Sequence, residues 1–80
     1  MIFKGKQWEY LRQCWHLTPR EIEVAKLVCA GLDNNQISRK LRIKYNTARA
    51  HMGNILRKVG TRSKAGLILE FFEVVRKARL

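Results

Sequence analysis

Residues 33–60, DNNQISRKLRIKYNTARAHMGNILRKVG, decide the fold. Asp33 precedes Gln36 by three positions, and this capping-box spacing predicts a helix over about residues 34–41. We expect the next three residues, 42–44, to form a tight turn before a second helix begins. A short helix joined by so short a turn to a longer one is the helix-turn-helix pattern.

The second, longer helix is predicted over about residues 46–59, and Gly60 ends it. Its apolar residues recur at the spacing of one helical face and are Ala48, Met52, Ile55, Leu56 and Val59. Its other face is small, polar or basic and carries Asn46, Arg49, Ala50, Gly53, Asn54 and Arg57. In helix-turn-helix proteins the second helix enters the DNA major groove. We therefore predict that this face binds double-stranded DNA.

Basic residues are concentrated in the same part of the chain. Seventeen Lys and Arg outnumber six Asp and Glu, so the formal net charge is +11. No acidic residue lies between Asp33 and Glu70. The basic residues of that interval are Arg39, Lys40, Arg42, Lys44, Arg49, Arg57, Lys58, Arg62 and Lys64. A solvated helical face normally mixes both signs of charge, so this interval indicates a polyanionic partner.

Two further helices are predicted on the N-terminal side. Thr18-Pro19-Arg20-Glu21 is a capping box with proline at the first helical position, and it predicts a helix over about 19–30. Gly31 follows at the position where a left-handed residue ends a helix. A short extra helix is expected over 7–15, where one face carries Trp8, Leu11 and Trp15.

The last predicted helix runs from its N-cap, Ser63, to about Arg79. Its apolar residues cover more than one face and are Leu67, Ile68, Leu69, Phe71, Phe72, Val74, Val75 and Ala78. We expect this helix to be covered by the domain's own core and, on a second side, by a partner or another part of the chain. The predicted fold class is all-α: a four-helix bundle with an extra short N-terminal helix and an extended C-terminal helix.

Several of these residues together resemble a known family. They are Leu17-Thr18-Pro19-Arg20-Glu21, Val24, Gly31-Leu32, Ile37, Thr47, His51, Asn54-Ile55-Leu56, Lys58 and Gly60. The stretch that carries them, about 17–70, is similar to the LuxR/GerE-type helix-turn-helix domain. The resemblance implies a bacterial DNA-binding transcription regulator that dimerises mainly through its fourth helix. We accordingly expect an N-terminal extension, 1–16, followed by a LuxR-type domain, 17–80.

The resemblance also implies where DNA would touch the chain. Arg49, Ala50 and Gly53 would face base edges, where Arg49 can bridge a guanine and Ala50 can touch a thymine methyl group. The residues expected at the DNA backbone are Asn34, Asn35, Lys44, Asn46, Thr47, His51, Asn54, Arg57 and Lys58. For His51, a hydrogen bond within the domain is the alternative. The residues expected at the contact between two copies are Leu67, Ile68, Phe71, Phe72 and Val75.

Three positions depart from the family pattern. Arg42 stands where glycine is usual, and a left-handed backbone there would cost about 1–2 kcal/mol. Lys44 stands where serine usually caps the recognition helix, which forfeits about 1 kcal/mol. Gly53 replaces longer side chains that commonly reach bases; it allows close approach but supplies no hydrogen bond. We therefore expect Arg49 to carry much of the base discrimination.

Two other functions fit the same features. A protein-interaction adaptor would use the apolar last helix and the Trp-rich N-terminus to hold another regulator. The promoter-reading domain of a sigma factor has a similar first-helix motif, but His51 and Asn54-Ile55-Leu56 argue against it. RNA binding is less favoured, because we expect the surface aromatic residues to lie outside the basic interval and to form no stacking platform.

We expect no enzyme, cofactor, metal or small-molecule ligand, because no catalytic triad or phosphate-binding glycine loop is visible. Cys14 and Cys29 form no CxxC pair, and we expect them to be buried thiols. Neither a signal peptide nor a membrane-spanning run is found, so a cytoplasmic, nucleoid-associated location is expected. With 16 residues ahead of Leu17, we expect control by abundance or a partner rather than by an attached receiver domain.

Overall fold

The computed structural model describes residues 2–80, which form five α-helices and no strand. The helices are α1 (Gly5–Trp15), α2 (Pro19–Cys29), α3 (Asn34–Leu41), α4 (Tyr45–Val59) and α5 (Lys64–Ala78). The all-α prediction is confirmed, and each helix agrees with its predicted range to within one turn. Over the described range, no helix combines the length and the apolar character needed to cross a bilayer.

Local hydrogen bonds fix the starts of α2 and α3. The Thr18 hydroxyl accepts from the Glu21 backbone N–H at 3.1 Å, and Glu21 Oε1 accepts from the Thr18 backbone N–H at 2.9 Å. Asp33 and Gln36 make the same reciprocal pair, at 2.8 and 2.9 Å. Both predicted capping boxes are confirmed. Each satisfies backbone N–H groups that a helix start would otherwise leave unpaired.

The turn between α3 and α4 has a left-handed residue that is not glycine. Arg42 adopts φ 55° and ψ 46°, and it ends α3. Gly31 and Gly60 adopt the same region of backbone conformation after α2 and α4. The turn therefore keeps its left-handed geometry, and the side chain at Arg42 costs about 1–2 kcal/mol relative to an unstrained residue.

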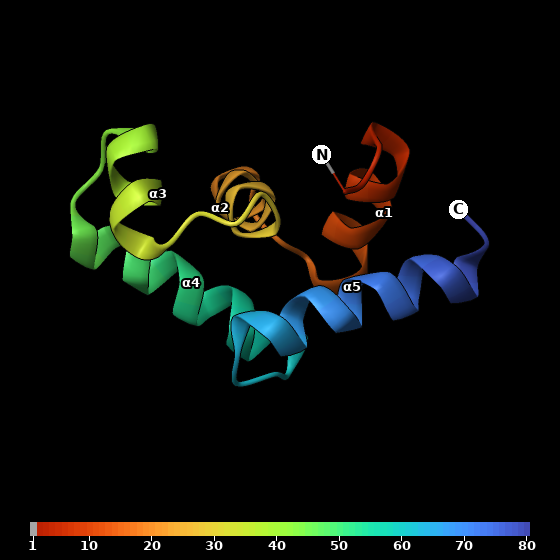
Figure 1. Cartoon of the computed structure of the whole chain (residues 1–80). Coiled ribbons are helices and arrows are strands. Elements are labelled where there is room, and N and C mark those ends of the chain that lie inside the picture. The colour runs from red at the N-terminus through yellow and green to blue at the C-terminus, as the bar shows by residue number, and fades with distance from the viewer. Residues whose placement is uncertain (1) are drawn as a thin grey trace.

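The helices form two rows (Figure 1). α4 and α5 follow one another along one side of the molecule, while α3, α2 and α1 lie across from them. α2 and α3 pack on α4, and α1 packs on α5. The molecule is elongated, with extents of 36 × 22 × 20 Å. The α3–α4 end and the α1–α5 end therefore present separate surfaces.

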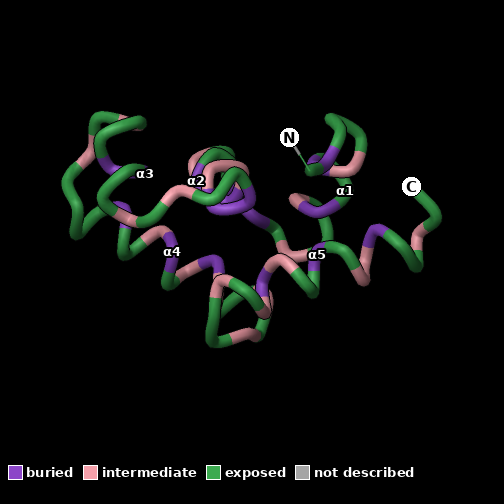
Figure 2. Tube along the Cα trace, viewed as in Figure 1, coloured by how far each residue is buried: buried purple, intermediate pink, exposed green. Residues whose placement is uncertain are grey.

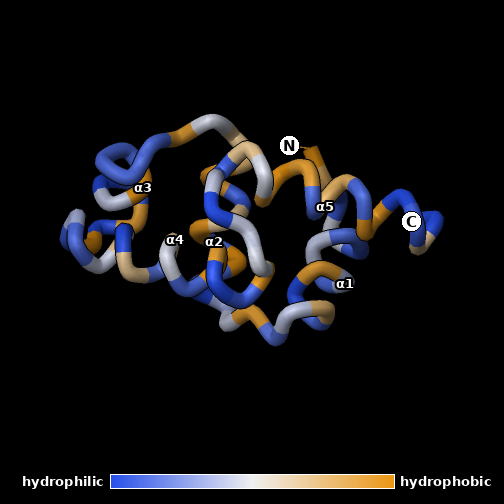
Figure 3. The backbone as a smooth tube through the Cα atoms, turned by 90° about the horizontal axis from the view of Figure 1, so that it is seen from below, coloured by the Kyte–Doolittle hydropathy of each residue, from blue (hydrophilic) through white to orange (hydrophobic). Residues whose placement is uncertain are grey.

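One hydrophobic core runs through both rows. Buried residues recur along every helix (Figure 2), and hydrophobic residues alternate with hydrophilic ones in the same way (Figure 3). The largest fully buried side chains are Phe71, Leu11, Leu17, Ile37, Ile55, Leu67 and Val24. Each contributes roughly 1.5–3 kcal/mol through burial. Because α1 supplies Leu11 and α5 supplies Phe71, the N-terminal helix belongs to this core.

Aromatic residues join α1 to α5. The Trp8 and Trp15 rings lie 5.9 and 5.6 Å from the Phe71 ring, and Phe3 lies 4.9 Å from Phe72. Part of the apolar surface of α5 is thus covered by another part of the same chain, one of the two predicted possibilities, while Leu69 and Phe72 remain exposed.

This packing limits which of the residues expected at the contact between two copies are accessible. Leu67, Phe71 and Val75 are only 0, 0 and 8% exposed, because they fill the protomer's own core. Of the five residues expected at such a contact, Ile68 is half-buried and Phe72 is 47% exposed. Only these two retain surface that a second molecule could touch.

Candidate nucleic-acid interface

α4 is held by its apolar face and exposes the opposite one. Ala48, Met52 and Ile55 are buried against α2 and α3, while Leu56 and Val59 pack at the edge of the core. On the outer face, the exposed residues are Asn46, Arg49, Ala50, Gly53 and Arg57, and Asn54 is half-buried. The periodicity that predicted an inner and an outer face is therefore confirmed.

The three residues expected to face bases are all accessible. Arg49, Ala50 and Gly53 are exposed, and Asn46, Arg49 and Ala50 line a shallow depression on the helix. A Cβ at Gly53 would meet no atom of this chain within 4 Å. Nothing inside the domain therefore requires glycine at this position.

The residues expected at the DNA backbone are distributed over α3 and α4. Asn35, Lys44 and Thr47 are exposed, whereas His51 is half-buried. Asn34 is also half-buried, and its side-chain oxygen is enclosed without a hydrogen-bond donor. Asn34 therefore has little surface with which to accept an external contact.

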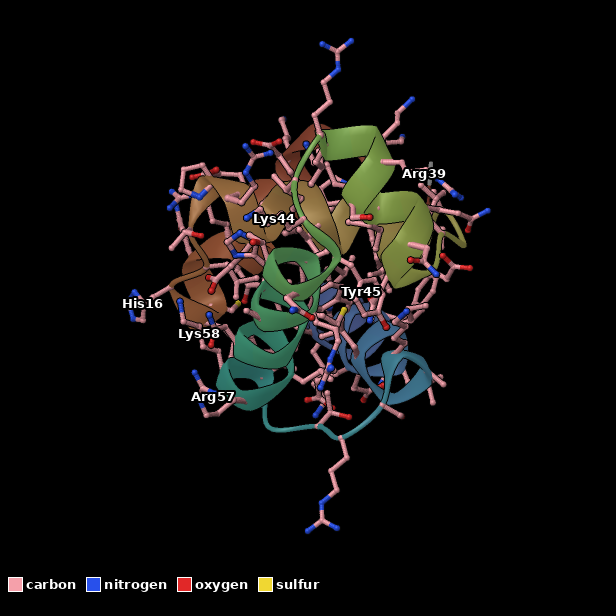
Figure 4. The ribbon with its side chains drawn as sticks, turned by 90° about the vertical axis from the view of Figure 1, so that its left-hand side faces the viewer. His16, Arg39, Lys44, Tyr45, Arg57 and Lys58 are labelled. Atoms are coloured by element: carbon pink, nitrogen blue, oxygen red, sulfur yellow. The ribbon has the colours of Figure 1, made fainter. Side chains whose placement is uncertain are left out.

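Cationic side chains flank α4 on both sides (Figure 4). Arg39 of α3 and Tyr45 lie toward one side of α4, and Arg57, Lys58 and His16 lie toward the other. We call the Lys and Arg residues of this region, Arg39, Lys44, Arg49, Arg57 and Lys58, the basic face. Arg57 donates a hydrogen bond to the side-chain carbonyl of Asn54, which holds its guanidinium along the helix.

Lys58 has an internal partner that sequence reasoning missed. Its Nζ lies 2.8 Å from Glu21 Oε1 and donates to the His16 carbonyl at 3.3 Å. Burial would raise the pKa of Glu21, but hydrogen bonds from Lys58 and from the Thr18 N–H outweigh it and lower the pKa below its usual value. The ion pair therefore fastens α4 to α2, and Lys58 is less available to DNA than expected. The partners are 37 residues apart, so no local pattern signals the pair.

The start of α4 differs from those of α2 and α3. Lys44 is its N-cap residue and makes no side-chain capping hydrogen bond, as the sequence predicted. The first residue of the helix, Tyr45, is 44% exposed. The expectation that the surface aromatic residues lie outside the basic interval is therefore wrong. Tyr45 was missed because it falls between the predicted turn and the predicted helix.

The cysteines and the acidic residues form no metal site. Among residues 2–80, no three His, Cys, Asp or Glu side chains gather closely enough to hold a metal ion. Cys29 is buried, and burial raises its pKa to about 11. Cys14 is exposed, so the prediction of two buried thiols is wrong for Cys14, which lies on the outer surface of α1.

Known proteins share this domain. Residues 16–71 match the family described as bacterial regulatory proteins, luxR family. The chain is 39% identical over 57 residues to a nitrate/nitrite response regulator protein homolog of Haemophilus influenzae, covering 71% of this chain and 27% of the relative. It is 37% identical over 64 residues to the transcriptional activator protein BglJ of Escherichia coli, covering 80% and 28%. For the nitrate/nitrite response regulator protein NarP of Escherichia coli, the identity is 37% over 57 residues, covering 71% and 26%.

These matches involve one part of each relative. The chain spans about a quarter of the length of the curated relatives that it matches. No solved structure matches the chain significantly.

Proposed function

Because the chain belongs to the LuxR family of bacterial regulatory proteins, we propose that it regulates transcription by binding double-stranded DNA. The observation that carries this proposal is the outer face of α4, which is exposed, contains no acidic residue and is flanked by cations. Such a face suits the polyanionic backbone of a duplex. The proposed role is binding without catalysis, at the bacterial nucleoid.

We propose that α4 enters the major groove while α3 crosses the DNA backbone, as in other helix-turn-helix proteins. Arg49 would donate two hydrogen bonds to a guanine, and Ala50 would touch a thymine methyl group. Gly53 would let the helix lie close to the base edges. The exposure of all three residues supports this arrangement.

The proposed backbone contacts are those with accessible polar or basic groups. They are Asn35, Lys44, Asn46, Thr47, Asn54 and Arg57, with a smaller part for the half-buried Asn34 and His51. Lys58 acts differently, since its pair with Glu21 orients α4. A log–log salt dependence of binding with a slope of about −0.9 per neutralised phosphate is expected.

We also propose that two copies bind a two-fold related site. The support is an apolar strip on the exposed side of α5, where Leu69 is 69% and Phe72 is 47% exposed and Ile68 is half-buried. These residues are spaced as neighbours on a helix surface. Leu69 thus replaces the three core residues of α5 in the proposed contact between copies. The same strip is what favours an adaptor as the second candidate function.

Selection of binding sites from a random duplex pool tests the proposal, because it reports binding, sequence preference and symmetry together. The expected result is a two-fold related consensus with half-sites about one helical turn apart. Light scattering of the wild type and of Leu69→Glu, with the selected duplex, then tests dimerisation, and Leu69→Glu should remain a monomer. Self-association without any duplex binding would favour the adaptor, and duplex binding that requires core polymerase would favour the sigma-factor domain.

A further inference from the structure

An exposed aromatic ring lies at the start of α4. Tyr45 is 44% exposed. The other exposed large apolar side chains among residues 2–80 are Ile2, Tyr10, Leu69, Phe72 and Leu80. All of those lie on α1, on α5 or at the adjoining chain ends. In the described part of the chain, Tyr45 is thus the only exposed large apolar side chain on α2, α3 or α4.

The surroundings of Tyr45 are basic and polar. Lys44 precedes it, Asn46 follows it, and Arg49 lies one helical turn away on the same side of α4. Figure 4 shows Tyr45 on the side of α4 toward Arg39, away from Arg57 and Lys58. No acidic residue occurs from position 34 to position 69. The ring therefore sits within the basic face, next to the residue proposed to read a base.

The chemistry of a phenol fits a DNA strand at this position. Its hydroxyl can donate to a phosphate oxygen, and its ring offers apolar area to a deoxyribose. At the centre of the outer face, Ala50 and Gly53 have no polar side-chain atom with which to contact a phosphate. Tyr45 and Arg49 are long side chains on this side of α4, and in helix-turn-helix proteins the N-terminal residues of the recognition helix contact the DNA.

We propose that Tyr45 is a DNA-contact residue whose ring packs on a deoxyribose and whose hydroxyl donates a hydrogen bond to a phosphate, beside the base pair that Arg49 reads. This inference rests on the proposed function, since it presupposes that α4 meets duplex DNA. It adds a contact that is neutral, so it contributes affinity without releasing a counterion.

The test measures the dissociation constant of the full chain for the duplex obtained by selection, using fluorescence anisotropy at several salt concentrations. Tyr45→Phe removes only the hydroxyl and should weaken binding about threefold, while Tyr45→Ala should weaken it about tenfold. The matched control is Tyr10→Ala, which removes a tyrosine that is 37% exposed on α1 and should leave affinity unchanged. The salt slope should stay the same in both Tyr45 variants, whereas Lys44→Ala should reduce it by about 0.9.

Each outcome bears on the inference. If the wild type binds the duplex and Tyr45→Phe and Tyr45→Ala bind within measurement error of it, the inference fails and the proposed function stands. Equal losses for Tyr10→Ala and Tyr45→Ala would also overturn the inference, because they would show a general effect on the fold. If the wild type bound single-stranded DNA tightly and Tyr45→Ala alone lost this binding, the ring would stack on a base. That result would overturn the proposed contact with deoxyribose and phosphate. Absence of any duplex binding by the wild type would overturn the proposed function and this inference with it.

Discussion

At the residue scale, one ion pair joins α4 to α2 beside their apolar contact. The Glu21 side chain is 5% exposed, and its carboxylate accepts from Lys58 Nζ at 2.8 Å. A carboxylate so deeply buried is costly without a charged partner. Lys58 therefore contributes to the basic face chiefly by keeping α4 against α2.

Lys58→Met should lower the free energy of unfolding by about 1.5–3 kcal/mol, because it leaves the Glu21 carboxylate without its charged donor. The matched control is Arg20→Met, which breaks the exposed pair between Arg20 and Glu23. That change should cost less than about 1 kcal/mol. Urea unfolding of the two variants measures the difference, and equal losses would contradict the role given to Lys58.

The same pair predicts a pH dependence of stability. The pKa of Glu21 is lower in the folded protein than its usual value, so the pair stabilises the fold above that value and is lost as the pH falls through the folded-state pKa. Between about pH 6 and about pH 3, the wild type should lose more stability than Glu21→Gln. Glu9 and Glu73 also have lowered pKa values. Because the wild type and Glu21→Gln both keep these two carboxylates, their effect is the same in the two proteins. If the free energies of unfolding of the two proteins fell by equal amounts over this pH range, the stabilising role of the Lys58–Glu21 pair would be contradicted.

Two helical glycines should respond oppositely to alanine. A Cβ at Gly66 would lie 2.3 Å from Thr61 Oγ1, whereas a Cβ at Gly53 would meet nothing within 4 Å. Gly53→Ala should therefore raise the free energy of unfolding by about 1 kcal/mol, the ordinary helix propensity gain. Gly66→Ala should lower it by about 1–3 kcal/mol through overpacking. Thermal unfolding measures both, and recovery of Gly66→Ala by Thr61→Ala would identify the hydroxyl as the cause.

At the scale of helices, local signals were predictable and distant contacts were not. The starts of α2 and α3 follow from capping boxes whose partners are three residues apart. The outer face of α4 follows from its apolar period, so the residues on that face could be identified from the amino-acid sequence alone. By contrast, the Lys58–Glu21 pair and the packing of α1 on α5 join residues far apart in the sequence. Tyr45 was missed because a helix boundary predicted from periodicity alone is uncertain by a residue or more.

The α1 helix should unfold together with the rest of the domain. Trp8 is 3% exposed and packs edge-on against Phe71 at 5.9 Å. Trp8→Ala should therefore lower the free energy of unfolding by about 3–5 kcal/mol, while the exposed neighbour Tyr10→Ala should change it little. Calorimetry of the wild type should give one cooperative transition. If the wild type instead showed a separate transition at lower temperature, and only Trp8→Ala removed it, α1 would unfold independently of the rest of the domain.

At the scale of the whole molecule, the two proposed contacts, with DNA and with a second copy, use different parts of an elongated domain 36 Å long. The basic face belongs to α3 and α4, and the exposed apolar residues Leu69 and Phe72 belong to α5. α3 and the start of α4 lie at one end of the molecule, and α5 extends to the other (Figure 1). In the proposed arrangement, DNA and a second copy therefore do not compete for the same surface. The net charge of +11 attracts any polyanion, so charge alone gives affinity without sequence preference. Discrimination has to come from the small set of side chains on the outer face of α4.

The most direct test of that claim is the affinity of Arg49→Glu and Lys6→Glu for the selected duplex at one salt concentration. Both substitutions reverse an exposed cation and change the net charge equally, but Lys6 lies on α1, away from the basic face. Arg49→Glu should weaken binding at least about tenfold more than Lys6→Glu, because it removes a bidentate base contact as well as charge. Equal weakening by the two variants would show that binding follows net charge alone and that α4 does not read the groove.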